Sequence, residues 1–381
     1  MSASGPVGDE PAFPSLLPLA RPYLPDPAAL ESDLKEILGS GRLTNDRFVR
    51  ALEEEAARFL GVRHCVAVSS CTAGLMLVLR AAGVRGGVVL PSFTFAATAH
   101  AAAWNDLHLS FADVKPGTLT LESEEIGVRS VPDTEAVIAT HIYGSPCDVE
   151  AIEREATTRS LFVMFDAAHA FGARRNGSHV GGFGDAEVFS LTPTKPVVAG
   201  EGGIVATNND DLARRLKVGR DYGNPGDYDC IFVGLNARMS EMHAALALRS
   251  LATLPERLDI RAALARSYRD LSMEVPGIAV VWPEEGDDST FKDLTVVVDP
   301  DAFGCDAPTL ADRLAANNVE TRRYYYPPVH RMKAYSAHAE TELPVTDQTA
   351  PNVLSLPLWE RMSASTPERV VRVLERIHDL G

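Results

Sequence analysis

A cysteine-based disulfide or metal framework is missing from this sequence, which has only five cysteines among 381 residues. They are scattered, odd in number, and never paired at a spacing that would hold a metal or form a redox site. We therefore expect no metal centre and no disulfide scaffold, and we expect these thiols to be reduced and mostly buried. They are Cys65, Cys71, Cys147, Cys230 and Cys305.

Positive charge is also scarce, and so are long hydrophobic runs. The 36 lysines and arginines face 52 aspartates and glutamates, which gives a formal net charge of −16. Because an acidic surface of this size repels phosphate backbones, we expect no nucleic-acid partner. Residues 1–26 contain neither a basic start nor a long apolar core, which predicts no signal peptide, no membrane span and a cytoplasmic location.

The composition that remains is typical of a globular enzyme, with 45% hydrophobic and 23% charged residues. The length exceeds one typical domain. Four prolines, at positions 14, 18, 22 and 25, predict a flexible or extended arm over residues 1–25. We expect a large domain over residues 26–255 and a smaller α+β domain over 256–381, with strands at 278–281, 293–298 and 320–325.

From residue 64 onward, short apolar strands alternate with helices. The strands are expected at residues 65–68, 88–90, 107–111, 136–143, 161–165, 188–189 and 204–206. This alternation predicts an α/β fold with a mostly parallel sheet covered by helices on both faces. In such sheets, ligands bind at the carboxyl ends of the strands.

Several strand ends carry candidate ligand-binding residues. Thr72 and Ala73 lie in a hydroxyl-rich segment where a strand leads into a helix N-terminus, a place that favours phosphate, although simple N-capping explains the same residues equally well. Phe95 follows the next strand and can stack on an aromatic ring. Asp166 ends the most apolar strand, where it either caps a helix or pairs with a pyridinium N–H. His141 is expected to be a satisfied core histidine.

Lys195 is the candidate nucleophile. It lies between Pro193 and Pro196, which stiffen the backbone, in a loop that joins two buried strands. A single lysine is usually a solvated surface residue. Here, however, Ser190 precedes it at a strand end, where a hydroxyl can reach a phosphate. An enclosed lysine has a lowered pKa, which suits a Schiff base with an aldehyde cofactor.

The order and spacing of these motifs resemble the DegT-type family of sugar aminotransferases, which depend on pyridoxal 5'-phosphate (PLP). The resemblance extends from about residue 29 to the C-terminus. Its motifs are Asp-Ala-Ala-His at 166–169, Ser-Leu-Thr-Pro-Thr-Lys at 190–195, Gly-Glu-Gly-Gly at 200–203, Gly-Leu-Asn-Ala-Arg-Met-Ser-Glu at 234–241 and Arg-Tyr-Tyr-Tyr-Pro-Pro-Val-His at 323–330.

This resemblance implies a fold-type-I PLP-dependent transferase with a large and a small domain, and it implies roles for individual residues. Lys195 would hold the cofactor and shuttle the proton between carbon atoms. Asp166 would keep the pyridine nitrogen protonated, so that the ring accepts electrons. Phe95 would stack on the ring, and His169 would contact its phenolic oxygen.

The resemblance also implies a homodimer with shared active sites. Thr72, Ala73 and Ser190 would hold the cofactor phosphate within one subunit. Asn236 and Arg238 would reach that phosphate from the neighbouring subunit.

The implied reaction moves an amino group from an amino acid, expected to be L-glutamate, to a keto carbon of a nucleotide-linked deoxysugar. The segment around Lys195 and the tyrosine-rich stretch favour C4 of a dTDP-4-keto-6-deoxyhexose, as in antibiotic or surface-polysaccharide pathways. Tyr326 and His330 would line the substrate cleft.

Three other functions compete with this reaction. Amination of a keto-cyclitol uses the same catalytic groups. A non-catalytic paralogue that binds PLP or a sugar is disfavoured because Lys195 and Asp166 are both present. A dinucleotide site is disfavoured because residues 69–74 lack the Gly-x-Gly-x-x-Gly turn that close approach to a pyrophosphate requires.

Overall fold

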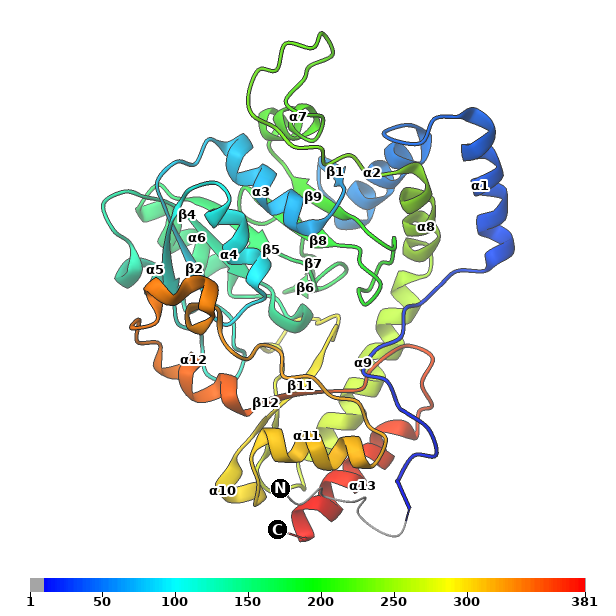
Figure 1. The fold of residues 1–381 in the computed structure, drawn as a ribbon, viewed down its shortest axis with the longest axis vertical. Helices are drawn as coiled ribbons and strands as arrows, with labels where there is room; N and C mark the ends of the chain where they lie inside the picture. The colour runs from blue at the N-terminus through cyan, green and yellow to red at the C-terminus, as the bar shows by residue number, and fades with distance from the viewer. Residues whose placement is uncertain (1–9, 381) are drawn as a thin grey trace.

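The computed structural model describes residues 10–380, which form a large body around a seven-stranded sheet and a smaller body around a three-stranded sheet (Figure 1). The large sheet has the order β1-β9-β8-β5-β4-β2-β3. Only β9 runs antiparallel to its neighbours, so the expected mostly parallel sheet is confirmed. Its strands are β1 (His64–Val68), β2 (Gly87–Pro91), β3 (His108–Ala112), β4 (Thr134–Thr140), β5 (Phe162–Asp166), β8 (Ala186–Ser190) and β9 (Gly203–Thr207).

Helices cover both faces of the large sheet. In β1, Val66 and Val68 belong to one buried cluster, while Cys65 and Ala67 belong to another on the opposite face. Both faces therefore exclude water, which explains why these strands are continuous apolar runs. The helices are α1 (Pro27–Ser40), α2 (Arg47–Leu60), α3 (Cys71–Ala82), α4 (Ala96–Ala103), α5 (Ser123–Arg129), α6 (Val149–Thr158), α7 (Asp210–Gly219) and α8 (Glu241–Leu251).

The start of α2 is capped by a side chain from far along the chain. Asp46 precedes the helix without capping it, and the Glu241 carboxylate accepts the N–H groups of Asp46 (2.8 Å), Phe48 (2.7 Å) and Val49 (3.1 Å). A buried carboxylate satisfies three amides that a helix start leaves free. Glu241, the last residue of one family motif, therefore joins α2 to α8.

The smaller body packs around an antiparallel sheet of β10 (Ile278–Val280), β11 (Leu294–Val298) and β12 (Val353–Leu356). The long helix α9 (Leu254–Ser272) leads into it from the large body (Figure 1). Its other helices are α10 (Pro300–Phe303), α11 (Ala307–Ala316) and α13 (Thr366–Asp379), while α12 (Pro344–Thr349) lies beside the large body. Short helical turns span Ile142–Gly144, Val329–Arg331, Lys333–His338 and Ala350–Asn352, and a small hairpin joins β6 (Arg174–Arg175) to β7 (Ser178–His179). A domain boundary near residue 255 stays a prediction.

The expected strand at residues 320–325 is wrong. The edge of β11 is taken instead by β12, and the 320–325 segment makes one isolated bridge, between Arg322 and Ser355. Beyond that bridge the chain turns towards the large body, where Tyr324 and Tyr325 face a cavity. The segment is apolar and aromatic because it is buried at that cavity. The same pattern led to the wrong prediction of a strand.

Over the part that the structure describes, the predicted N-terminal arm is extended and packs against the smaller body. Residues 1–9 lie outside the described residues. Leu17 bridges to Val319, with its N–H donating to the Asn318 carbonyl at 2.7 Å, and Phe13 is buried in the core of the smaller body. The prolines prevent a helix here, yet they leave an extended segment that adds to the edge of that core.

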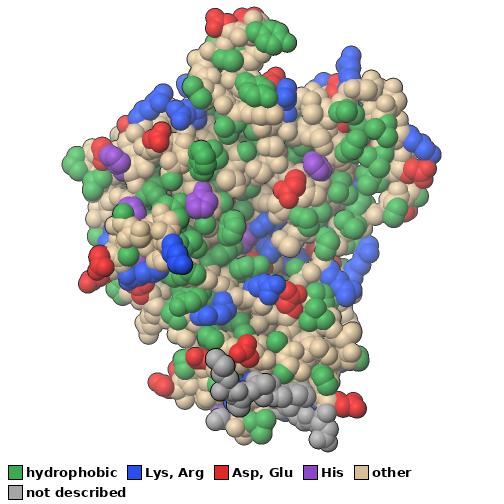
Figure 2. All heavy atoms as spheres, viewed as in Figure 1, with side chains coloured by type: hydrophobic (Ala, Val, Ile, Leu, Met, Phe, Trp, Pro, Cys, Tyr) green, Lys and Arg blue, Asp and Glu red, His purple; other side chains and the backbone are tan. Residues whose placement is uncertain are grey.

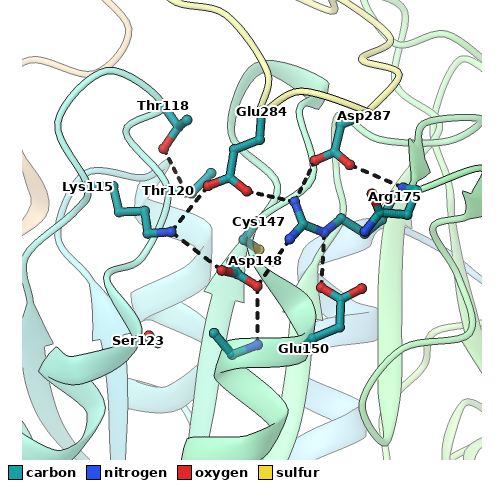
Figure 3. A network of polar contacts seen from close by, with 12 residues as sticks. Lys115, Thr118, Thr120, Ser123, Cys147, Asp148, Glu150, Arg175, Glu284 and Asp287 are labelled. Atoms are coloured by element: carbon teal, nitrogen blue, oxygen red, sulfur yellow. Dashed lines mark hydrogen bonds and ion pairs between the residues drawn. The ribbon is translucent and has the colours of Figure 1, made fainter.

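A partly buried ion cluster connects the two bodies (Figure 3). Arg175, on β6, donates hydrogen bonds of 2.7–3.2 Å to four carboxylates. Two of them, Asp148 and Glu150, lie at the start of α6, and the other two, Glu284 and Asp287, lie in the loop after β10. Lys115 adds contacts to Glu284 (3.2 Å) and Asp148 (3.5 Å). We call these six residues the Arg175 cluster; it fixes the loop that leads to β11.

Candidate active site

The carboxyl ends of β5 and β8 face a cavity of about 340 Å³ between the two bodies. Six residues expected from the sequence line it together: Thr72, Phe95, Asp166, His169, Ser190 and Lys195. The smaller body contributes Lys292, Asp293, Tyr324 and Tyr325. A larger groove of about 520 Å³ beside Phe59 and Trp282 contains none of the expected residues.

Lys195 lies on the loop that connects β8 to β9. Hydrogen bonds within the loop and with α8 and α9 hold this loop in place. The Lys195 N–H donates to the Thr192 carbonyl at 3.0 Å. The next carbonyl, of Pro196, accepts a 2.6 Å bond from the buried guanidinium of Arg257, and the N–H of Val198 donates to the Ser250 hydroxyl at 3.0 Å. The proline-bracketed loop is therefore a rigid support for the lysine.

The environment of Lys195 favours its neutral amine. Burial in the cavity, together with the positive charge of Lys292, lowers the pKa of Lys195 to about 8. A pKa of about 8 leaves roughly a tenth of the amine unprotonated at pH 7, far more than an ordinary lysine has, and a nucleophile or general base requires this neutral form. The sequence prediction of an enclosed, reactive lysine agrees with this geometry.

Asp166 ends β5 with its carboxylate almost fully buried. Its Oδ2 accepts a 2.7 Å hydrogen bond from the Thr98 hydroxyl, and its Oδ1 accepts the N–H of Ala168 at 3.1 Å. Thr98, on α4, bonds to Thr94, which bonds to Thr140, so a chain of hydroxyls orients the carboxylate. Burial raises the pKa of Asp166, and a cationic N–H in the cavity would offset that cost.

The N-terminus of α3 forms another wall. Ser70 is its N-cap and accepts the Ala73 N–H at 3.1 Å, so the capping interpretation of this segment is right for Ser70. Thr72 and Ser190 line the cavity, whereas Ala73 does not, and its N–H is already bonded to Ser70. Gly203 allows the close approach, because a Cβ there would lie 2.8 Å from the Cys71 nitrogen.

Aromatic side chains form one side of the cavity. Phe95 is exposed at the mouth, with its ring centroid 6.0 Å from that of Tyr325. The Tyr325 hydroxyl lies 3.3 Å from His169 Nε2. Burial, together with the charges of Lys195 and Lys292, lowers the pKa of His169 well below its usual value, so the ring is neutral.

Sequence reasoning missed Lys292, Asp293, Tyr324, Tyr325 and Thr98. Asp293 was taken only as the first residue of a strand. The signal that could have exposed it is the charged dipeptide Lys292-Asp293 directly before the buried strand β11, because paired charges seldom enter a core without a role. Thr98 carried no signal, because one threonine on a helix has many uses.

Asn236 and Arg238 do not reach the cavity of their own chain. Arg238 donates to Asp221 at 2.9 Å and to the Asn236 side chain at 3.2 Å. Asn236 forms an isolated bridge with Asp221, so Asn236 and Arg238 lie at the base of the loop that follows α7 and projects at the top of Figure 1. The tip of this loop carries exposed apolar side chains (Figure 2), among them Tyr228, Ile231 and Val233. That these two residues serve a neighbouring subunit stays a prediction.

The two expected substrate contacts are not in the cavity. The Tyr326 ring is half exposed and lies under the Arg323 guanidinium at 4.1 Å. His330 is fully buried, with Nδ1 2.5 Å from the Ser92 hydroxyl and Nε2 3.2 Å from Asp347, so its ring is committed to packing. The tyrosine-rich stretch instead presents Tyr324 and Tyr325 to the cavity.

The expectation for His141 is confirmed. Its Nδ1 accepts the Cys147 N–H at 3.0 Å, and its Nε2 lies 3.1 Å from the buried carboxylate of Glu187. Glu187 also accepts the N–H groups of Gly181 and Phe183. The histidine is therefore a satisfied core residue. Separately, among residues 10–380 no group of three or more acidic, histidine and cysteine residues is arranged to hold a metal ion.

The residues of the cavity fit PLP. The N-terminus of α3 with Thr72 and Ser190 suits a phosphate, and buried Asp166 suits a ring N–H. Lys195 provides the amine. His169 Nδ1 and Asp293 Oδ2 are buried and have no hydrogen-bond partner among the described residues, as expected where a ligand completes a site.

Comparison with known proteins agrees with this geometry. The DegT/DnrJ/EryC1/StrS aminotransferase family matches residues 27–375. The dTDP-4-amino-4,6-dideoxy-D-glucose transaminase of Escherichia coli is 28% identical over 94% of this chain and 98% of its own. The UDP-N-acetyl-3-dehydro-alpha-D-glucosamine 3-aminotransferase of Acidithiobacillus ferrooxidans is 34% identical over 90% and 93%.

A solved structure shares the whole architecture. DesI, crystallised in the presence of its TDP-sugar product, superposes with a TM-score of 0.92, has 36% identity and covers 97% of this chain and 96% of its own. No helix within residues 10–380 is both long and apolar enough to cross a membrane. The chain therefore belongs to the DegT/DnrJ/EryC1/StrS aminotransferase family and is a fold-type-I, PLP-dependent aminotransferase.

Proposed function

We propose that this enzyme transfers an amino group from L-glutamate to C4 of a dTDP-4-keto-6-deoxyhexose, in a natural-product or polysaccharide pathway. The observation that carries the proposal is the single cavity in which Lys195, Asp166 and the α3 N-terminus converge. The C4 assignment is supported by the name of the E. coli relative, which specifies a 4-amino-4,6-dideoxy sugar. The A. ferrooxidans relative is named for amination at C3 of a UDP-sugar, so that substrate is the comparison to test.

The chain's own residues have distinct tasks in this reaction. When bound, PLP supplies an aldehyde that accepts the amino group and a ring that accepts the electron pair of the broken C–H bond. Lys195 Nζ takes the proton from the donor's α-carbon and returns a proton on the other side of the transferred nitrogen. Asp166 holds a proton at the ring nitrogen, and Thr98 keeps that carboxylate in place.

We also propose that the active enzyme is a cytoplasmic homodimer. The apolar tip of the projecting loop supports this assembly, since Tyr228 is 92% exposed and Val233 76% exposed on a single chain. Burial of that tip against a second copy would bring Asn236 and Arg238 towards the neighbouring cavity. The cytoplasmic location rests on the sequence alone.

The proposal is tested by an absorbance spectrum of the purified holoenzyme before and after addition of L-glutamate. The visible band should fade as the cofactor accepts the amino group. Addition of a dTDP-4-keto-6-deoxyhexose should then restore the band and give a 4-amino sugar nucleotide, detected by mass spectrometry and NMR. If the band were restored only by a UDP-3-keto sugar or a keto-cyclitol, that compound would be the acceptor in place of the proposed one. No band even with added PLP would contradict the enzyme assignment.

Replacing Asp166 by asparagine should leave the fold intact and slow the glutamate half-reaction by about 10²-fold, because an amide cannot hold the ring nitrogen in its protonated form. Stopped-flow measurement of the fading band gives this rate directly. Thr98→Val is the matched control. It removes one hydrogen bond to the same carboxylate and should slow the step by less than about 10-fold. An unchanged rate in the Asp166→Asn variant would contradict the assigned role.

A further inference from the structure

We propose that Lys292 binds a carboxylate of the amino acid donor and that Asp293 holds it in position for that contact. This assignment rests on the proposed function, because it concerns the donor half of the same reaction. Neither residue belongs to a motif that carried the family resemblance. Their role follows from the charges around the cavity, the backbone that carries them and the polar atoms left without partners.

Within one chain, one cation of the cavity is not committed to the cofactor. Among the described residues that line it, Lys195 and Lys292 are the basic side chains, and no arginine lines it. Lys195 is committed to the cofactor. An amino acid must bring at least one carboxylate into the cavity, and a buried carboxylate requires a cationic partner. Asp166, Glu201 and Asp293 add negative charge there, so Lys292 is the group able to receive it.

Lys292 is prepared for such a contact. Its side chain is only 5% exposed, and its Nζ donates a 2.6 Å hydrogen bond to Asp293 Oδ1. The ring of Tyr324 lies 5.9 Å away. An ammonium group has three N–H donors, and within residues 10–380 the bond to Asp293 is the one hydrogen bond that Nζ makes. Two donors therefore remain for a ligand.

The backbone that carries Lys292 and Asp293 is held by several hydrogen bonds and includes one strained residue. The Arg261 guanidinium, from α9, donates to the carbonyls of Thr290 (3.0 Å), Phe291 (2.5 Å) and Lys292 (3.1 Å). The Thr290 hydroxyl donates to the His169 carbonyl at 2.6 Å. Phe291 has a φ of 45°, a strained conformation for a bulky residue. Strain of this kind persists where the position of a neighbouring group matters.

Two unpartnered atoms beside Lys292 could compensate Asp293 when a carboxylate binds. Asp293 Oδ2 and His169 Nδ1 both lack a partner and lie 3.9 Å apart. A small rotation would let the His169 N–H donate to Asp293, which would compensate Asp293 as Lys292 turns part of its charge to the ligand. The same bond would fix which nitrogen of His169 carries the proton. A buried ion pair adds little stability by itself, so stability alone does not explain the pair.

The test compares both half-reactions of the holoenzyme with those of Lys292→Met. The apparent Kd for L-glutamate, from the concentration dependence of the fading band, should rise about 10- to 100-fold, the effect of one lost charge-assisted hydrogen bond. The half-reaction with the keto-sugar nucleotide should change less than about threefold. Lys292→Arg should recover part of the affinity. Loss confined to the sugar half-reaction, or equal loss in both, would overturn the proposal.

Two further measurements guard against misfolding and against failure of the proposed function. Lys292→Met with Asp293→Asn removes the unpaired carboxylate and should show the same loss of glutamate affinity. Titration calorimetry with glutarate, which cannot react, should show weaker binding to both variants than to the parent, whether or not the parent turns over any donor. Lys35→Met, on α1 with its side chain 74% exposed, should leave glutarate binding unchanged. Equal glutarate affinity in the parent and the Lys292 variants would refute the carboxylate site.

Discussion

Replacing Lys195 by alanine should lower turnover by about 10⁴-fold or more, the upper range for loss of a general acid–base group. The expected loss is large because the amine has two tasks, holding the cofactor and moving the proton, and no other described lysine of the cavity lies on the β8–β9 loop. The fold should be retained, because Arg257 and Ser250 hold this loop through backbone atoms. Turnover of L-glutamate and the visible spectrum of the purified variant measure the effect.

Lys195→Arg is the matched control for this change. Arginine keeps the positive charge but stays protonated at all accessible pH values, so it cannot act as a nucleophile or base. It should be as inactive as the alanine variant. If arginine restored turnover, Lys195 would act only through its charge. If the alanine variant kept full activity, the central assignment of the site would be wrong.

Replacing Arg175 by methionine should reduce the free energy of unfolding by about 1.5–3 kcal/mol, the range for hydrogen bonds to charged groups, because three of its four carboxylate partners are partly exposed. Four carboxylates would then face one another with only Lys115 nearby (Figure 3). Urea denaturation followed by circular dichroism measures the loss. Part of it should be recovered in high salt, since salt screens the repulsion among the carboxylates that remain.

The control for Arg175 is Arg372→Met on α13. Arg372 pairs with Glu368 one helical turn away, and its side chain is 65% exposed. Exposed pairs of this kind contribute at most about 1 kcal/mol, so this variant should be nearly as stable as the parent. A similar, small loss in both variants would show that the Arg175 cluster does not hold the two bodies together.

The fold of the large body was predictable because its signals are local. Short apolar strands, helix caps and glycine stops each lie within a few residues, and β1 and β5 begin and end within one residue of their expected limits. The fold of the smaller body was harder to predict from the sequence. The residues of β12 show no alternation that separates them from neighbouring turns, so the third strand was placed at residues 320–325. Pairing between β11 and β12 depends on contacts across more than 50 residues.

The candidate site also has one part that local sequence predicts and another that it does not. Asp166, Ser190 and Lys195 lie at strand ends or in the loop beside them, so their positions follow from the strand pattern. Lys292 and Asp293 reach the cavity only because Arg261 and the Arg175 cluster shape the preceding loop, and no local pattern records that. His330 is buried against Ser92 in the single chain, and its expected place in a substrate cleft stays a prediction.

The antiparallel pairing of β9 with β1 has a consequence for how the cell makes this enzyme. Val68, directly before the α3 start, pairs with Gly203, directly after the Lys195 loop, so two segments more than 130 residues apart must meet before the cavity exists. A chain still on the ribosome lacks half of this pair until residue 207 has emerged, and Lys292 follows later. The cofactor therefore cannot guide early folding. It binds the finished chain and stabilises it by mass action, so a cell short of cofactor holds more of the protein in its unfolded form.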